Sequence, residues 1–293
     1  MGTTDVSTIT LQSSAEFSVA AKDGQIYKIQ VAWPMEWQSR SGHKNIAVLY
    51  AVDGNAMFLT AAEAAWRRAT GPHHKGNGVV ISIGYPLKGR VFSPRRNYDL
   101  TPPSPTAPEG FGGADHFLDF IQYTLKPFVT SMILPNTAIE REALYGHSFG
   151  GLFTLYTLFT RPSLFDCFIA SSPSIYWSNF YILTLEEEFR KRHVRQQPSL
   201  MMYYGSYEQH PPRWADEDAE KYEKRRQGAE ERAMTDSANA MYRRLKDSGL
   251  LTCVTIKEYP KEDHGTVIAC SLSRGLTTFF EEWPLKEEGS RES

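Results

Sequence analysis

Two uninterrupted apolar runs, at residues 46–52 and 78–84, constrain the fold of this chain more than any other feature. A strand without a polar face must be covered on both sides, as in parallel sheets that carry helices on both faces. Shorter apolar runs and helical patterns alternate through the rest of the chain. We expect further strands at 142–145, 165–170, 200–204 and 251–259, and helices at 117–133, 150–160, 237–248 and 266–280. This alternation predicts an α/β fold with a mostly parallel central sheet and helices on both faces.

The start of the chain follows a different pattern. Two alternating runs, 17–21 and 26–33, flank Asp23-Gly24, a dipeptide typical of tight turns. They predict a β-hairpin that adds an antiparallel N-terminal edge to the sheet. No repeat or linker divides the 293 residues, so we expect a single domain over 1–293. Its ordered core should span about 15–284, with a candidate lid around 174–198.

Two segments have the composition of insertions. Residues 93–113 are rich in proline and glycine, which predicts an ordered surface loop. Residues 208–233 are densely charged and predict a solvated helix or loop.

Composition and charge exclude several classes of function. The formal net charge of −2 lacks the basic excess expected for a nucleic-acid partner. The chain has three cysteines, an odd number, and they are not closely spaced: Cys167, Cys253 and Cys270. We therefore expect free thiols rather than a disulfide framework or a zinc site. Neither a metal nor another cofactor is implied. No apolar run reaches about 18 residues, and residues 1–14 lack the apolar core of a secretory signal. We therefore expect a cytoplasmic protein without a membrane partner.

The pentapeptide Gly146-His147-Ser148-Phe149-Gly150 fits the G-x-S-x-G pattern of a nucleophile elbow. A predicted strand precedes it and a predicted helix follows, which is the context that the pattern requires. The tight turn would expose the hydroxyl of Ser148 above the sheet, at a helix N-terminus that favours negative charge. The sequence therefore predicts an α/β-hydrolase fold with Ser148 as nucleophile. The alternative is a glycine-rich turn without chemistry.

A serine hydroxyl becomes nucleophilic when a base accepts its proton. In this fold the chain order is serine, acid, histidine, which leaves His193, His210 and His264. His193 lies in a basic stretch and His210 precedes two prolines, whereas His264 lies between the last predicted strand and the last predicted helix. We expect His264 to be the base. His147 should point away from Ser148, which favours a packing or positioning role.

The acid that orients the histidine should follow the predicted strand 200–204. Glu208 occupies that turn, and Asp216, Glu217 and Asp218 are nearby alternatives. A serine–histidine dyad without an acid is also open.

An oxyanion formed during ester cleavage needs two backbone donors. The amide of Phe149 is one, and the loop Asp53-Gly54-Asn55-Ala56 should supply the other.

These residues also resemble a known family. Val52-Asp53-Gly54-Asn55, the elbow, Ser172-Pro173-Ser174 and Asp263-His264-Gly265 together are similar to the esterase-D-like branch of the α/β hydrolases. Within that branch the chain most resembles the siderophore esterases, which open ester-linked iron chelators inside cells. The segment Arg96-Asn97-Tyr98-Asp99-Leu100-Thr101-Pro102 is similar to that group as well. The similarity runs from about residue 17 to residue 280.

The resemblance implies roles for two residues and a substrate class. Asn55 would supply the second oxyanion amide, with Gly54 as its nearest rival, and Glu208 falls where the relatives carry their acid. A serine esterase that forms an acyl-enzyme on a siderophore is implied, with a cyclic hydroxamate triester such as triacetylfusarinine C favoured. Enterobactin-type catecholate trilactones, general carboxylic esters and S-formylglutathione are alternative substrates. An acyltransferase, a peptidase and a non-catalytic binding protein are further alternatives.

Candidate substrate contacts lie on either side of the elbow in sequence. Tyr176 and Trp177 begin an aromatic cluster after the Ser-Pro-Ser turn, where they would line a wide apolar pocket or pack the core. Arg95 and Arg96 would steer an anionic substrate or pair with Asp99. The oligomeric state is not indicated by the sequence.

Overall fold

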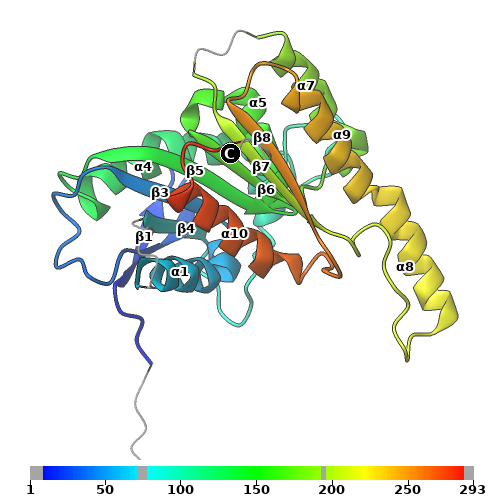
Figure 1. The fold of residues 1–293 in the computed structure, drawn as a ribbon, viewed down its shortest axis with the longest axis horizontal. Coiled ribbons are helices and arrows are strands. Elements are labelled where there is room, and N and C mark those ends of the chain that lie inside the picture. Colours follow the sequence, from blue (N-terminus) through cyan, green and yellow to red (C-terminus); the bar gives the residue numbers. More distant parts are fainter. Residues whose placement is uncertain (1–8, 71–77, 193–195, 287–293) are drawn as a thin grey trace, which may run out of the picture.

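The computed structural model describes residues 9–70, 78–192 and 196–286. In this part of the chain one sheet of eight strands runs through the molecule in the order β1-β2-β4-β3-β5-β6-β7-β8 (Figure 1). Its strands are β1 (Ser14–Ala20), β2 (Ile26–Ala32), β3 (Ile46–Val52), β4 (Gly78–Gly84), β5 (Ile139–His147), β6 (Cys167–Ser171), β7 (Ser199–Gly205) and β8 (Cys253–Tyr259).

The sheet is parallel from β4 to β8 and antiparallel at its N-terminal edge. β1 pairs antiparallel with β2, which pairs antiparallel with β4, and every later neighbour is parallel. The fold class predicted from the sequence is therefore confirmed. The apolar runs explain the centre of the sheet, since all residues of β3 and β4 are buried.

Helices cover both faces of the sheet (Figure 1). α1 and α10 lie side by side on one face, while α5, α7 and α9 lie on the other (Figure 1). Each face of the sheet packs against its helices in a separate hydrophobic cluster, and alternate residues of β3 belong to one cluster or the other. Tyr50 belongs to the cluster that includes Leu152 of α5, and Leu49 to the cluster that includes Leu272 of α10. The helices are α1 (Gly54–Thr70), α2 (Arg96–Asp99), α3 (Ala114–Phe120), η1 (Ile121–Leu125), α4 (Lys126–Phe128), η2 (Val129–Ile133), α5 (Phe149–Thr160), η3 (Pro162–Leu164), α6 (Trp177–Phe180), α7 (Ile182–Arg190), α8 (Ala219–Arg232), α9 (Met234–Lys246) and α10 (Val267–Glu281).

Three segments differ in detail from the sequence-based expectation. The loop expected at 53–56 is the first turn of α1, which begins directly after β3. The helix expected at 117–133 contains two π-helical stretches, η1 and η2, on either side of Pro127, which has no N–H to donate. The charged segment 208–233 is a loop followed by α8, which projects from the body of the molecule (Figure 1).

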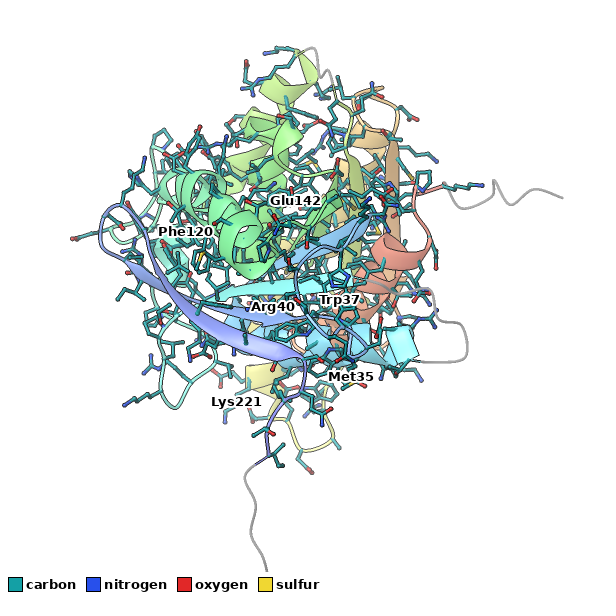
Figure 2. The ribbon with its side chains drawn as sticks, turned by 90° about the vertical axis from the view of Figure 1, so that its left-hand side faces the viewer. Met35, Trp37, Arg40, Phe120, Glu142 and Lys221 are labelled. Atoms are coloured by element: carbon teal, nitrogen blue, oxygen red, sulfur yellow. The ribbon has the colours of Figure 1, made fainter. Side chains whose placement is uncertain are left out.

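The connection between β2 and β3 is held by its aromatic and basic side chains. Trp37 stacks on His43 with ring centroids 3.5 Å apart, and the guanidinium of Arg40 lies over the rings of Phe17 and Trp33. Figure 2 labels Trp37 and Arg40 on this segment. Across the described residues, no helix is both long and apolar enough to cross a membrane.

Replacing Leu49 by alanine is expected to lower the free energy of unfolding by about 2–5 kcal/mol. The side chain is fully buried in β3, where neighbouring strands cannot collapse into the cavity. Leu59 on α1 is 62% exposed and serves as the matched control, with an expected change under about 0.5 kcal/mol for Leu59→Ala. Urea denaturation followed by circular dichroism measures both variants. Equal losses in the two would contradict this placement of the core.

Candidate active site

Ser148 lies at a sharp turn between β5 and α5. Its backbone is held at φ 59°, ψ −117°, an uncommon conformation for a residue other than glycine. The turn brings the two elements so close that a Cβ on Gly146 would lie 2.1 Å from the carbonyl oxygen of Gly150. A Cβ on Gly150 would lie 2.9 Å from Val52 of the neighbouring strand. The glycines of the motif are thus required by packing, and the serine hydroxyl projects at the N-terminus of α5.

The structure brings Ser148, His264 and Glu208 together from three separate connections. Nε2 of His264 lies 3.0 Å from Oγ of Ser148, and Nδ1 of His264 lies 2.8 Å from Oε2 of Glu208. Glu208 follows β7, and His264 lies between β8 and α10. Of the other candidate bases, His210 is exposed, and His193 lies outside the described residues. This geometry suits proton transfer from Ser148 to His264.

The carboxylate of Glu208 is fixed on its far side. Its Oε1 accepts hydrogen bonds from the hydroxyl of Ser172 and from the amide of Gly205, both at 2.6 Å. The side chain is buried, so these donors and His264 satisfy a charge that would otherwise be costly to bury. Glu208 therefore presents one oriented oxygen to Nδ1 of His264.

The alternative acids are occupied elsewhere. Asp218 caps the N-terminus of α8 by accepting from the amides of Glu220 and Lys221. Glu217 forms an ion pair with Arg225, and Asp216 is exposed.

The loop that carries His264 has its own cap. Oδ1 of Asp263 accepts from the amides of Thr266 at 2.9 Å and Gly265 at 2.8 Å. These backbone hydrogen bonds hold the pKa of Asp263 below its ordinary value. The ionised side chain thus closes the turn that leads into α10.

The two predicted oxyanion amides lie at the N-termini of helices on adjacent strands. Phe149 begins α5 after β5, and Asn55 lies in the first turn of α1 after β3, which pairs with β5. First-turn amides have no partner within their helix. Among the described residues, neither amide donates to a backbone carbonyl elsewhere. The Asn55 side chain is bonded to both backbone groups of Tyr85, at 2.9 and 2.7 Å, which fixes the position of its turn.

An ion pair anchors the start of α1 to the insertion. Arg96 donates to both carboxylate oxygens of Asp53, at 2.8 and 2.9 Å, and its guanidinium lies 5.4 Å from the ring centroid of Phe149. Asp53 is buried at a φ of 55° directly before α1. Arg96 therefore contacts both segments that carry the predicted oxyanion donors.

The other predicted substrate contacts are also engaged within the protein. Arg95 pairs with buried Asp99 at 2.9 Å, as one of the two sequence-based interpretations proposed. Trp177 is 6% exposed and stacks against Phe111, whereas Tyr176 is partly exposed. A role in substrate contact for these residues and Arg96 stays a prediction.

Two serines at the site were not assigned chemistry by sequence reasoning. Ser172 donates to Glu208, and Oγ of Ser174 lies 3.3 Å from Oγ of Ser148. The signal was present as Ser172-Pro173-Ser174 directly after a predicted strand. Strand ends in a parallel sheet meet at one edge, so hydroxyls there can reach the nucleophile.

The predicted lid at 174–198 contains α6 and α7. The hydroxyl of Ser178 in α6 bonds those of Ser104 and Thr106, both at 2.7 Å, which ties it to the 93–113 insertion. Residues 193–195 of the predicted lid lie outside the described residues. Movement of this segment stays a prediction.

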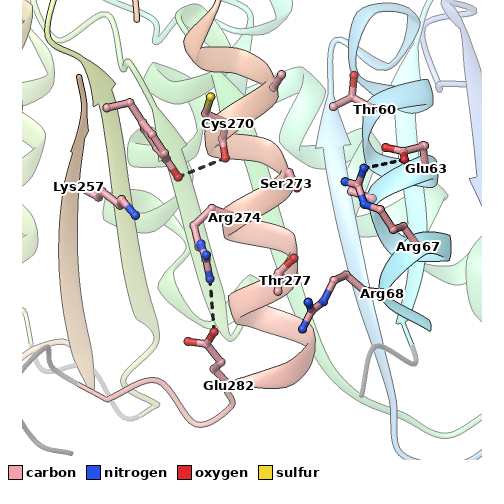
Figure 3. A pocket seen from close by; sticks show the side chains of 13 residues that line it. Thr60, Glu63, Arg67, Arg68, Lys257, Cys270, Ser273, Arg274, Thr277 and Glu282 are labelled. Atoms are coloured by element: carbon pink, nitrogen blue, oxygen red, sulfur yellow. Dashed lines mark hydrogen bonds and ion pairs between the residues drawn. The ribbon is translucent and has the colours of Figure 1, made fainter. Parts of the chain in front are cut away.

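A polar groove of about 620 Å³ lies between α1, α10 and β8 (Figure 3). Its cations largely face carboxylates: Arg67 pairs with Glu63, and Arg274 pairs with Glu282. No member of the Ser148–His264–Glu208 group lines it. We therefore place the candidate active site at the carboxyl edge of the sheet and not in this groove.

The nucleophile elbow on this sheet defines the class of α/β hydrolases. A family model for esterases, described as "Putative esterase", matches residues 21–243, and the chain belongs to this family. It is 49% identical to a siderophore triacetylfusarinine C esterase of Aspergillus fumigatus, over 96% of this chain and 98% of the relative. It is 43% identical to a siderophore enterobactin esterase of Emericella nidulans, over 90% and 93% of the two chains. The solved siderophore hydrolase EstB of Aspergillus nidulans superposes with a TM-score of 0.91 at 46% identity, covering 96% and 99%.

Replacing Glu208 by glutamine is expected to lower kcat at least about 100-fold. The Gly205 amide and the Ser172 hydroxyl would hold the amide oxygen, so the –NH₂ group would face Nδ1 of His264 and favour the wrong tautomer. Steady-state ester hydrolysis measures the effect. Asp216→Asn is the control, because Asp216 is exposed and should tolerate the same change. A larger loss in the control would show that Glu208 is not the acid.

Replacing Arg96 by lysine is expected to lower kcat about tenfold with little change in KM. Lysine cannot reproduce the two-point contact with Asp53, so the turn before α1 would shift. Arg95→Lys, which leaves that contact intact, is the comparison. If Arg96→Lys instead raises KM at constant kcat, Arg96 binds the substrate directly.

Proposed function

We propose that this chain is a serine esterase that hydrolyses the ester bonds of an iron-chelating siderophore through an acyl-enzyme. A cyclic hydroxamate triester of the triacetylfusarinine C type is the favoured substrate. The observation that carries this proposal is the 49% identity to the Aspergillus fumigatus esterase across nearly the whole of both chains. His264 lies within hydrogen-bonding distance of both Ser148 and Glu208, which supports the same chemistry.

In the first half of the proposed reaction, Oγ of Ser148 attacks the ester carbonyl while Nε2 of His264 accepts its proton. The amides of Phe149 and Asn55 donate to the oxyanion that forms, and each such donor contributes about 3 kcal/mol to lowering the barrier. Glu208 stabilises the imidazolium through Nδ1. The tetrahedral intermediate then collapses to an acyl-serine. The siderophore oxygen that is expelled takes the proton from His264 and leaves as an alcohol.

In the second half, His264 accepts a proton from water, whose oxygen attacks the acyl-serine carbonyl. Collapse of this intermediate releases the carboxylic acid and returns the proton to Ser148. Each cycle consumes one ester bond and one water, so a cyclic triester would be opened and then cut in successive cycles. Iron enters only as part of the substrate.

The surroundings of Ser148 support a bulky substrate. Phe149, Phe111 and Trp177 form a connected aromatic cluster, with ring centroids 6.2 and 6.4 Å apart, that begins at the residue after the nucleophile. Aromatic walls suit large apolar acyl groups, and distant contacts with such groups can lower the barrier.

A catecholate trilactone is the second candidate, because the Emericella nidulans relative at 43% identity is named an enterobactin esterase. A ferric catecholate is anionic, whereas a ferric trihydroxamate is close to neutral. The arginines near the site are paired with Asp53 and Asp99, which leaves little excess positive charge there. That pairing favours the hydroxamate. Action in the cytoplasm is part of the proposal, and fractionation of cells that express a tagged chain tests it.

Replacing Ser148 by alanine should abolish turnover of every ester while leaving the circular dichroism spectrum unchanged. The alanine has no nucleophile, and a residual rate above about one-hundredth of wild type would contradict the assignment. A fluorophosphonate probe, read by peptide mass spectrometry, should label Ser148. Ser174→Ala is the control, because Ser174 lies 3.3 Å away and should keep the labelling.

The substrate proposal is tested by specificity constants. We expect kcat/KM for triacetylfusarinine C to exceed those for enterobactin, S-formylglutathione and nitrophenyl acetate by at least about tenfold, because only a large substrate uses the remote contacts. Ferric and iron-free forms are compared, with products identified by mass spectrometry. Equal constants for the siderophore and nitrophenyl acetate would leave a general carboxylesterase. Preference for enterobactin would favour the second candidate.

A further inference from the structure

His147 precedes Ser148 in sequence, yet its side chain takes no part in the hydrogen bonds that join Ser148, His264 and Glu208. It is the last residue of β5 and is 4% exposed. Because side chains alternate along a strand, it shares a face of the sheet with Tyr145, which belongs to the core under α1 and α10. A histidine buried this deeply needs hydrogen-bond partners, and their identity shows what it does.

A chain of buried hydroxyl groups begins at His147. Its Nδ1 lies 3.1 Å from Oγ of Ser171, at the end of β6. Oγ of Ser171 lies 2.8 Å from Oγ of Ser271 in α10. The hydroxyl of Tyr145 lies 3.0 Å from Oγ of Ser271 as well. All four side chains are buried. The chain therefore links the ends of two adjacent strands to the helix that crosses beneath them.

This link bears directly on the position of His264. α10 begins at Val267, three residues after His264, so an anchor at Ser271 also fixes the turn that carries the base. The rings of His147 and His264 are in contact, with centroids 4.6 Å apart. Ser148 follows His147 directly. The nucleophile and the base are thus attached to opposite ends of one buried polar connection.

His147 is held in its neutral form. Burial lowers its pKa well below the ordinary value, and the nearby charges of His264 and Arg96 act in the same direction, against an opposing hydrogen bond with the backbone of His264. A neutral ring does not repel the imidazolium that forms on His264 during the reaction. It also leaves Nδ1 able to accept a hydrogen bond from the hydroxyl of Ser171.

We propose that His147 is a positioning residue for the general base, acting through Ser171, Ser271 and Tyr145 to hold His264 at hydrogen-bonding distance from Ser148. It does not touch the ester. The inference rests on the proposed function, since it takes His264 to be the base that activates Ser148.

Two substitutions of His147 separate its hydrogen bonds from its volume. His147→Phe keeps a ring of similar size but loses the hydrogen bonds to Ser171 and to the backbone of His264, while His147→Asn places an amide near the position of Nδ1 and can keep the bond to Ser171. For His147→Phe we expect kcat to fall about 10- to 100-fold with KM unchanged, because a small displacement of the base slows the chemical step. His147→Asn should recover most of that loss.

A second pair of variants tests the connection at its far end. Ser271→Ala removes the central hydroxyl and should lower kcat about tenfold, whereas Ser273→Ala, on the groove side of the same helix, should leave it unchanged. The double variant His147→Phe with Ser271→Ala should be no slower than His147→Phe alone, because both changes break one network.

The outcomes distinguish this inference from the proposed function. All variants are assayed with nitrophenyl acetate and with the siderophore ester, beside Ser148→Ala, and their melting temperatures are recorded. If Ser148→Ala is inactive while His147→Phe and Ser271→Ala keep the wild-type kcat, the positioning role is wrong and the proposed function stands. A fall in kcat that only follows melting temperature, with asparagine no better than phenylalanine, would also overturn it. Turnover by Ser148→Ala would instead contradict the proposed function.

Discussion

The close approach of β5 and α5 at Ser148 determines how the rest of the site is arranged. The turn leaves no space for a side chain at Gly146 or Gly150 and holds Ser148 in an uncommon backbone conformation. The end of β6 and the turn after it hold both backbone groups of this residue, because the amide of Ser148 donates to the carbonyl of Ser171, and the amide of Ser174 donates to the carbonyl of Ser148. The strain of the turn is thus offset by backbone hydrogen bonds to the end of β6. Every other group at the site is positioned relative to this turn.

Buried carboxylates fix the remaining connections at the same edge of the sheet. Glu208 accepts from a hydroxyl, an amide and His264, and Asp53 accepts two bonds from Arg96. A buried charge is stable only when its partners remain in place, so each carboxylate couples the segments that supply them. Asp53 couples α1 to the 93–113 insertion, and Glu208 couples the ends of β6 and β7 to the loop of His264. These segments are therefore expected to keep their relative positions during catalysis.

The sequence predicted what depends on short-range patterns and missed what depends on contacts across the fold. The strands, the antiparallel edge and the elbow follow from apolar periodicity and glycine spacing, as in β3 and β4. The bonds of Ser172 to Glu208 and of Arg96 to Asp53 join residues that are 36 and 43 positions apart. No local pattern distinguishes such an arginine from one that binds an anionic substrate. The helix at 54–70 was not predicted either, because α1 begins only two residues after the end of β3, without the loop that usually marks the start of a helix.

The fold separates the groups proposed to perform the chemistry from those proposed to recognise the substrate. Ser148, Glu208 and His264 are attached to strand ends, where the sheet restricts their motion, and the buried chain from His147 to Ser271 adds a further connection beneath them. The aromatic cluster instead contains Phe111 of the 93–113 insertion and Trp177 of α6. These two segments contact each other through the hydrogen bonds of the Ser178 hydroxyl, and neither contributes a strand to the sheet. We therefore expect the choice of this chain between a hydroxamate triester and a catecholate trilactone to depend on these segments more than on Ser148, His264 and Glu208.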